Sequence, residues 1–192
     1  MPDIVKPYSV DLDLSIGTLK SFNKKVEVKL SELREFFFDR EAADNIIKKH
    51  NDPAMYVYFE NSHPHMRGEM NFGVTILSPG KVGYEYNMTR GHYHSKRCGE
   101  VYVGLRGEGI VVMQTKDGMF FHSPIRRGKV VYVPPSWAHR TVNTCDRKLS
   151  FFYAYASDAG HDYGTIRRKG FAKLVVEKRG KPKIIDNPRF TR

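Results

Sequence analysis

The stretch Gly91-His92-Tyr93-His94 is followed, after five intervening residues, by Glu100, and residues 134–139 read Pro-Pro-Ser-Trp-Ala-His. Side chains alternate between the two faces of a strand, so the first two histidines point to the same side. Five residues are enough for a tight reversal that returns the carboxylate beside them, while the third histidine arrives from a separate strand. The sequence therefore predicts a metal site of three imidazoles and one carboxylate: His92, His94, Glu100 and His139.

The chemistry of this ligand set favours a catalytic metal site. Imidazole and carboxylate groups suit divalent iron, nickel, manganese, cobalt and zinc. Four protein ligands in an octahedral shell leave two positions open for substrate oxygens, whereas structural sites are closed.

Histidine pairs and a neighbouring cysteine also have interpretations other than this metal site. A His-x-His pair alone also occurs as surface histidines on a strand, and His63-Pro64-His65 has the same spacing. Proline is excluded from central strands, so we expect that second pair to lie in an exposed loop. Cys98 lies close enough to be a thiolate ligand, but we expect a free thiol because the histidine and carboxylate set is complete without it.

The residues that flank these ligands, and their spacing, resemble the sequence motifs of a known family. His-x-His, Glu100 and Gly107 resemble the first cupin motif, and Gly128, Pro134, His139 and Asn143 resemble the second. Three longer stretches are similar to the archaeal cupin-type glucose-6-phosphate isomerases, over residues 89–94, 131–143 and 158–165. The resemblance extends from about residue 6 to residue 189. It implies an all-β fold, the cupin double-stranded β-helix or jelly-roll barrel, and the interconversion of glucose 6-phosphate and fructose 6-phosphate.

The resemblance also implies the roles of individual residues. For the implied reaction we expect Glu100 to be the base, because a carboxylate beside the metal could move a proton between adjacent carbons, with His161 as a second candidate that shuttles a proton or opens the sugar ring. The resemblance assigns substrate binding to Tyr56, Thr75, Thr89, Gly91, Tyr102, Tyr155, His161 and Tyr163. Within that set, Thr75, Thr89 and the Gly91 N–H are candidates for the phosphate. Taken without the family, threonines and glycines are common in loops, and buried tyrosines more often belong to a core.

The resemblance implies one divalent metal ion per chain, with Fe²⁺ first and Ni²⁺, Mn²⁺, Zn²⁺ or Co²⁺ as alternatives. It also makes a homodimer our expectation. Two rival functions use the same fold, because cupins host many chemistries. A cupin iron oxygenase would bind dioxygen at the same ligands, and a non-catalytic sugar-binding cupin would bind saccharide without turnover.

Length and composition limit the other function classes. The 192 residues predict a single domain over 1–192, and two cysteines are too few for a disulfide framework, which favours a reducing cytoplasm. No signal peptide and no apolar stretch of membrane-spanning length is found, so we expect no membrane partner. The net charge is +11, and residues 167–192 hold ten Lys or Arg against two acids, a net of +8. Without a nucleic-acid-binding motif, we expect the partner to be a sugar phosphate rather than nucleic acid.

Hydrophobic periodicity predicts the elements. Residues 6–20 alternate like an extended edge or exchanged strand before a glycine, and residues 30–50 carry a helical pattern with Ser31 and Asp39 as possible N-caps. From residue 54 to 186 the period is two, with turn signals between short runs, as in a barrel. The predicted strands are 55–59, 71–77, 84–88, 100–105, 109–114, 119–122, 130–133, 140–143, 149–155, 171–177 and 182–185.

Overall fold

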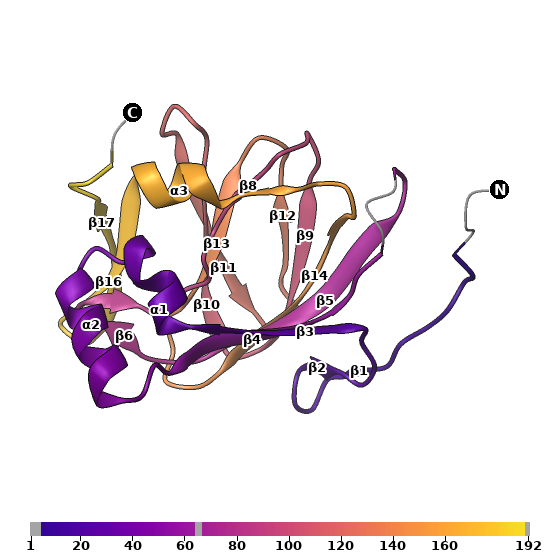
Figure 1. Cartoon of the computed structure of the whole chain (residues 1–192), viewed down its shortest axis with the longest axis horizontal. Helices are drawn as coiled ribbons and strands as arrows, with labels where there is room; N and C mark the ends of the chain where they lie inside the picture. Colours follow the sequence, from indigo (N-terminus) through magenta and orange to yellow (C-terminus); the bar gives the residue numbers. More distant parts are fainter. Residues whose placement is uncertain (1–4, 64–66, 191–192) are drawn as a thin grey trace.

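The computed structural model describes residues 5–63 and 67–190, and antiparallel strands form its main body (Figure 1). One sheet has six strands in the order β12-β9-β14-β5-β4-β3. In chain order their bounds are Lys24–Lys29 (β3), Ala54–Asn61 (β4), Met70–Leu77 (β5), Glu100–Arg106 (β9), Val130–Val133 (β12) and Leu149–Ala156 (β14). The predicted strands of this sheet are confirmed to within two residues at each end, except for β3, which the sequence analysis missed.

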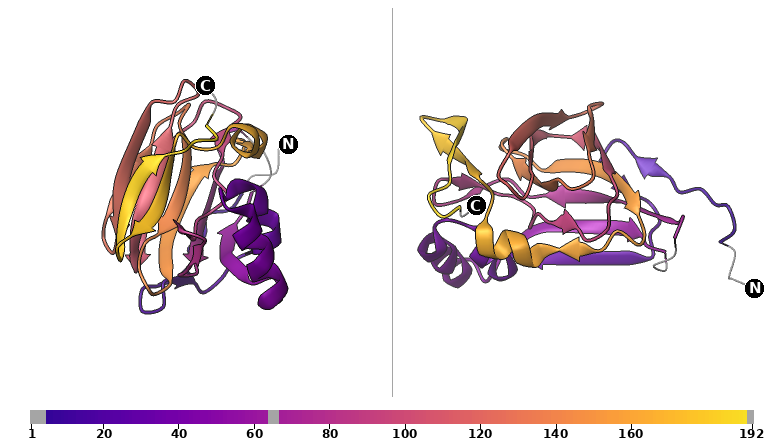
Figure 2. Two further views of the ribbon diagram at one scale, coloured as in Figure 1. Left: turned by 90° about the vertical axis from the view of Figure 1, so that its left-hand side faces the viewer. Right: turned by 90° about the horizontal axis from the view of Figure 1, so that it is seen from above.

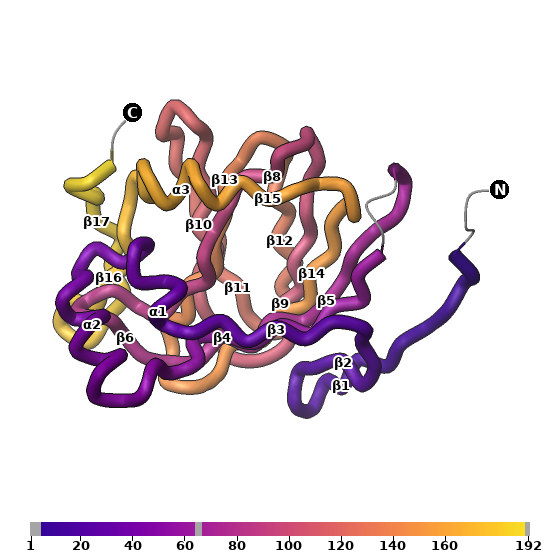
Figure 3. Tube along the Cα trace, viewed as in Figure 1, coloured from indigo at the N-terminus to yellow at the C-terminus, as the bar shows by residue number. Residues whose placement is uncertain are grey.

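A second, three-stranded sheet in the order β11-β10-β13 faces the first, and the two enclose the barrel of the cupin fold (Figure 3). Its strands are Glu108–Gln114 (β10), Phe120–Arg126 (β11) and Ala138–Asn143 (β13). Two smaller sheets contain the remaining described strands of the barrel and of its helix-covered end. Their strand orders are β15-β8 and β17-β16-β7-β6. Their strands are Lys81–Val82 (β6), Glu85–Tyr86 (β7), Tyr93–His94 (β8), His161–Asp162 (β15), Lys173–Lys178 (β16) and Lys181–Asp186 (β17). The predicted strand 84–88 is thus only two residues long.

The helical region is broken into pieces that cover one end of the barrel, beside β16 and β6 (Figures 1 and 2). These are α1 (Leu30–Leu33), the 3₁₀ turn η1 (Arg34–Phe36) and α2 (Arg40–Lys49). The break follows from the burial of Phe37 and from the Phe38 N–H, which donates to the carboxylate of Glu85 instead of to a helical carbonyl. Asp39 caps α2 as predicted, by accepting from the N–H of Ala42. Ser31 lies inside α1 rather than at its N-cap.

The extended segment expected over residues 6–20 contains less strand than predicted. Only β1 (Leu12–Asp13) and β2 (Thr18–Leu19) form, and they pair with each other rather than with the barrel. The Asp13 carboxylate accepts from the N–H groups of Ser15 and Ile16, which turns the chain back after two residues. The edge of the large sheet is therefore β3, which pairs with β4.

Two apolar clusters pack on the two faces of the large sheet. The main cluster fills the barrel and continues beneath the helices, where Leu30, Leu33 and Phe37 are almost fully buried. The smaller cluster joins Leu19 to Val74 and Leu105, so the β1–β2 hairpin covers part of the outer face. Among the described residues, no helix is long and apolar enough to cross a membrane.

Candidate metal centre and substrate pocket

The four predicted ligands come together inside the barrel. One ligand atom from each of His92, His94, Glu100 and His139 can be chosen so that all four lie within 4.8 Å of one another. The Oε2 atom of Glu100 is 2.9 Å from Nε2 of His139 and 3.2 Å from Nε2 of His94. Nε2 of all three histidines and Oε2 of Glu100 are buried without a well-aligned hydrogen-bond partner among the described residues. Buried polar atoms are almost always paired in native proteins, so four converging unpaired atoms fit a metal ion.

Backbone contacts hold the ligands in place. His92 forms an isolated bridge with His139, in which each N–H donates to the other's carbonyl at 3.2 and 3.1 Å. The Nδ1 atom of His139 lies 3.3 Å from the carbonyl of Trp137, and Nδ1 of His94 lies 3.4 Å from that of Cys98. Such contacts to Nδ1 fix the ring and leave Nε2 as the free ligand atom. The extended segment expected around His92 is shorter than predicted, because only Tyr93 and His94 form a strand.

Burial sets the charge state of this cluster. Burial and the three neighbouring histidines hold the pKa of His92 well below its usual range, so its imidazole is neutral and able to act as a ligand. Burial alone would raise the pKa of the Glu100 carboxyl, but His139 and His94 outweigh it and bring that pKa to about 2. The cluster therefore offers the neutral imidazole of His92 and the ionised carboxylate of Glu100. Cys98 lies outside it, with Sγ 3.2 Å from the Nδ1 side of His94, and is a free thiol.

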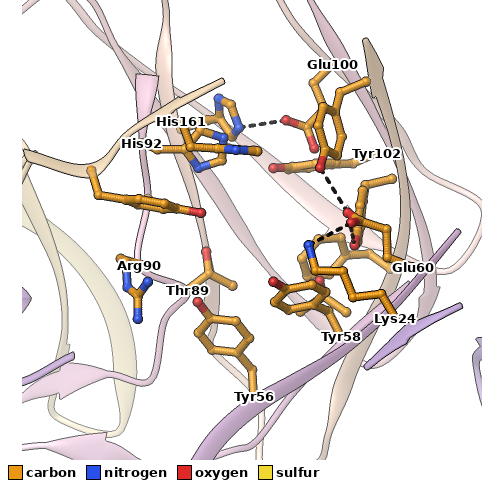
Figure 4. Close-up of a pocket in the computed structure, with 17 residues that line it drawn as sticks. Lys24, Tyr56, Tyr58, Glu60, Thr89, Arg90, His92, Glu100, Tyr102 and His161 are labelled. Atoms are coloured by element: carbon orange, nitrogen blue, oxygen red, sulfur yellow. Dashed lines mark hydrogen bonds and ion pairs between the residues drawn. The ribbon is translucent and has the colours of Figure 1, made fainter. Parts of the chain in front are cut away.

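A cavity of about 190 Å³ opens beside the cluster (Figure 4). All eight residues predicted to bind substrate line it, together with three of the four metal ligands. Six further residues that the sequence analysis did not single out for the site also line it: Lys24, Tyr58, Glu60, Arg90, Phe151 and Tyr153. The pair His63-Pro64-His65 lies partly outside the described residues; His63 itself contacts the backbone oxygen of Met70 and the hydroxyl of Tyr8, away from the cavity.

His161 enters the cavity from a late segment of the chain. Its strand β15 pairs with β8, and the ring centroid of His161 lies 4.3 Å from that of His92. Burial lowers the pKa of His161 to about 4, so its imidazole is neutral near pH 7. Tyr163, which stacks on His161, begins the short helix α3 (Tyr163–Lys169). This helix was not predicted, although Asp162 caps it through the N–H and hydroxyl of Thr165.

Thr89 and Arg90 line the cavity on the side away from Glu60 (Figure 4), and Gly91, the next residue along the chain, lines the cavity as well. The hydroxyl oxygen of Thr89 accepts from the N–H of Thr141, which leaves its proton free to donate. The Arg90 guanidinium lies 5.1 Å from the ring centroid of Tyr163 and forms an ion pair with Glu32. The arrangement offers hydroxyl, backbone and guanidinium donors to an anion.

Buried Arg140 supports this segment from behind. Its Nη2 donates to the carbonyl of Arg90 at 2.7 Å, and its guanidinium lies 4.6 Å from the ring centroid of Phe171. Gly91 has φ +74°, and a Cβ there would lie 3.0 Å from Arg140 and Phe171. Glycine is required because both its backbone angle and its packing exclude a side chain.

Lys24 and Glu60 are the charged residues of the opposite wall that the sequence analysis missed. A signal for Glu60 was present: Tyr56, Tyr58 and Glu60 alternate along β4 and so share one face. Lys24 gave no comparable signal, because its strand was not predicted and lysine is common on exposed edges.

Comparison with known proteins agrees with the geometry. Residues 27–189 match the family model described as glucose-6-phosphate isomerase (GPI). The chain is 45% identical to the glucose-6-phosphate isomerase of Pyrococcus abyssi over 96% of this chain and 97% of that protein. The enzymes of the same name from Thermococcus litoralis and Thermococcus kodakarensis are 44% and 43% identical, with the same coverage. A solved oxalate oxidase is similar over 53% of this chain and 49% of its own, with 14% identity and a TM-score of 0.44.

The family match covers most of the chain, and the relatives align along almost their whole length. The match includes every predicted metal ligand and every predicted substrate-binding residue, since all lie between residues 27 and 189. The chain belongs to the glucose-6-phosphate isomerase family, in its cupin-type branch.

Proposed function

We propose that the chain interconverts glucose 6-phosphate and fructose 6-phosphate in the cavity beside His92, Glu100 and His139. The observation that carries this proposal is the combination within one cavity of four converging ligand atoms and, on a separate wall, donors suited to a phosphate. Isomerisation of a sugar phosphate requires that the phosphorylated chain be positioned and that negative charge developing on the oxygens of C1 and C2 be stabilised, and this cavity offers groups suited to both tasks.

We propose that His92, His94, Glu100 and His139 hold one divalent metal ion, with Fe²⁺ as the native ion. Three imidazoles and one carboxylate suit iron, and also nickel, manganese, cobalt and zinc. When bound, such an ion supplies Lewis-acid polarisation of a carbonyl oxygen.

We assign the phosphate to Thr75, Thr89 and the Gly91 N–H, and add Arg90. Arg90 contributes a permanent positive charge to a wall whose other donors are neutral. Tyr56, Tyr102, Tyr155 and Tyr163 would then close around the sugar, since each lines the cavity. A phosphate held here places the other end of the substrate at the histidine cluster.

We assign proton transfer between C1 and C2 to Glu100, with His161 as the shuttle for ring opening. The Glu100 carboxylate is ionised and lies among the ligand imidazoles, close to where C1 and C2 would be held. A carboxyl with a pKa of about 2 is a weak base, so correct placement rather than basicity must favour the transfer. His161 is neutral, lies beside His92 and is not one of the four converging ligands, which leaves both ring nitrogens available for proton exchange.

The polar cavity favours an isomerase over the two rival functions. An oxygenase acting on an apolar substrate would need an apolar pocket, whereas Lys24, Glu60 and Arg90 line this one. A binding protein without turnover has no need of four buried, unpaired ligand atoms.

We further propose that residues 1–192 form one cupin domain, which assembles as a cytoplasmic homodimer. The continuous core from the helices into the barrel supports a single domain. Leu14 and Ile16 on the β1–β2 hairpin are more than half exposed, and an interface would bury them. Two free cysteines fit a reducing compartment. Light scattering of the purified chain tests the dimer directly.

The isomerase proposal is tested by the turnover of fructose 6-phosphate before chelation, after chelation, and after single divalent ions are restored. We expect activity to be lost on chelation, to return with iron or another of the named ions, and to be absent from a His92→Ala variant. A folded protein that binds these ions yet turns over no fructose 6-phosphate would refute the proposal, and oxygen uptake would be measured next.

A further inference from the structure

One row of the large sheet carries a set of polar side chains across the cavity wall opposite Arg90. In the strand register Lys24 lies opposite Glu60, Glu60 opposite Gly73, and Gly73 opposite Tyr153. A Cβ on Gly73 would lie 2.5 Å from the hydroxyl oxygen of Tyr153. The glycine therefore leaves room for the tyrosine side chain to cross β5 and reach Glu60 on the next strand, where its hydroxyl donates to Oε2 at 3.0 Å.

Glu60 is held in one position by its partners. Its side chain is only 3% exposed, and Oε2 accepts from the hydroxyls of both Tyr153 and Tyr155 at 3.0 Å. Oε1 accepts from the ammonium of Lys24 at 3.2 Å. Each carboxylate oxygen accepts about two hydrogen bonds, so Oε2 is saturated and Oε1 keeps one free position.

Lys24 is also held in position by its contacts. Its ammonium lies 5.6 Å from the ring centroid of Tyr58 and donates to Oε1 of Glu60. An ammonium has three donors, so donors remain beyond the bond to Glu60. Lys24 and Glu60 both line the cavity, and the Lys24 ammonium points into it (Figure 4). The pair thus presents free N–H donors of the ammonium beside one free acceptor position of the carboxylate.

We propose that Lys24 and Glu60 bind a hydroxyl group on the carbon chain of the sugar phosphate and so determine specificity for hydroxylated substrates. A hydroxyl both donates and accepts, which matches the free donor and acceptor of the pair. A phosphate only accepts near pH 7 and would meet the Glu60 carboxylate, so it fits this wall poorly. This inference rests on the proposed function for its substrate class.

The test compares Lys24→Met with Lys25→Met by calorimetric titration. Lys25 is the next residue on the same edge strand, but it faces the other side of the sheet, 5.7 Å from the ring centroid of Phe59. Both changes remove one charge from the same strand, so the second controls for net charge and for strand stability. The Lys24 side chain is 45% exposed, and its removal leaves the core unchanged.

Two probes of equal length separate hydroxyl from phosphate recognition. One is 6-phosphogluconate, which carries hydroxyls along its chain, and the other is 6-phosphohexanoate, which has the same two charged ends and no hydroxyls. We expect Lys24→Met to weaken binding of 6-phosphogluconate by about ten- to a hundredfold, the loss typical of a hydrogen bond to a charged group. Lys25→Met should leave it unchanged, and all three proteins should bind 6-phosphohexanoate equally.

Three results would overturn the inference. If Lys24→Met weakened binding of both probes equally, Lys24 would be a phosphate-binding cation. If it weakened binding of neither probe, Lys24 would not contact the substrate. If the unaltered protein did not bind 6-phosphogluconate, the hydroxyl-binding subsite would not exist. Glu60→Gln should reproduce the selective loss if it folds, as circular dichroism would show. Turnover of fructose 6-phosphate by the unaltered protein, measured alongside, shows separately whether the isomerase proposal holds.

Discussion

His161 lies directly opposite His94 in the register of the β15–β8 pair, and the centroids of their imidazole rings are 5.8 Å apart. A strand of two residues thus brings a fourth imidazole beside the predicted metal ligands without adding it to the converging set. The neighbouring Tyr155 ring packs edge-on against His161 at 5.3 Å. This pairing gives the cavity a neutral histidine outside the converging set.

Replacing His161 should separate catalysis from metal binding. We expect His161→Gln to lower kcat by about a hundredfold or more, the usual contribution of a positioned acid or base. Its metal content, measured by mass spectrometry after desalting, should equal that of the unaltered protein. His94→Gln is the matched control and should lose metal as well as activity. Loss of metal from His161→Gln would show that His161 is a ligand.

Metal binding should stabilise the fold through the converging ligand atoms. A ligand that binds only the folded state at a free concentration of 100 times its dissociation constant adds about 2.7 kcal/mol to the free energy of unfolding. We expect the melting temperature of the chelated protein to rise on addition of Fe²⁺ or Ni²⁺, and His139→Ala to abolish that rise. His122→Ala removes an exposed histidine on β11 and should retain it. An unchanged rise in His139→Ala would argue against this site.

Gly73 should tolerate no side chain, because a Cβ there would lie 2.4 Å from the carbonyl oxygen of Phe59 and 2.5 Å from the Tyr153 hydroxyl. Gly73→Ala is therefore expected to lower the free energy of unfolding by about 1–3 kcal/mol, as for other overpacked positions. Urea denaturation of the variant and the unaltered protein measures this change in the free energy of unfolding. Gly164→Ala, within α3, has its nearest neighbour at 3.3 Å and should be neutral or stabilising. Equal effects of the two substitutions would refute the packing argument.

The Asp162 cap should make the stability of the chain depend on pH. The hydroxyl and N–H of Thr165 hold the pKa of this carboxyl below its usual range. Its contribution is then present above the unfolded pKa of about 4 and is lost as pH falls through the lower, folded value. We expect Asp162→Ala to cost about 1 kcal/mol at pH 7, and the difference from the unaltered protein to shrink below pH 4. Urea denaturation of the chelated proteins across this range measures it; a constant difference would contradict the prediction.

The sequence alone was sufficient to predict the four converging side chains and most of the strands. The spacing of His92 and His94 places both side chains on one face of the chain, and a period of two shows in strands such as β9 and β14, where buried residues alternate with more exposed ones. The family resemblance named the residues that line the cavity, since motif residues keep their places when a fold is shared. Spacing, periodicity and motif residues are local features, so they can be read from the sequence without the three-dimensional structure.

Only the tertiary structure decided which residues complete the opposite wall and how the ends of the chain are arranged. Lys24 contacts Glu60 because β3 pairs with β4, and Tyr153 reaches Glu60 because Gly73 has no side chain. Hydrophobic periodicity within one strand does not show which strand it pairs with. The helix expected over residues 30–50 is interrupted because the N–H of Phe38 bonds to Glu85, a contact between residues 47 positions apart. Local propensity gave way there to long-range packing and hydrogen bonding.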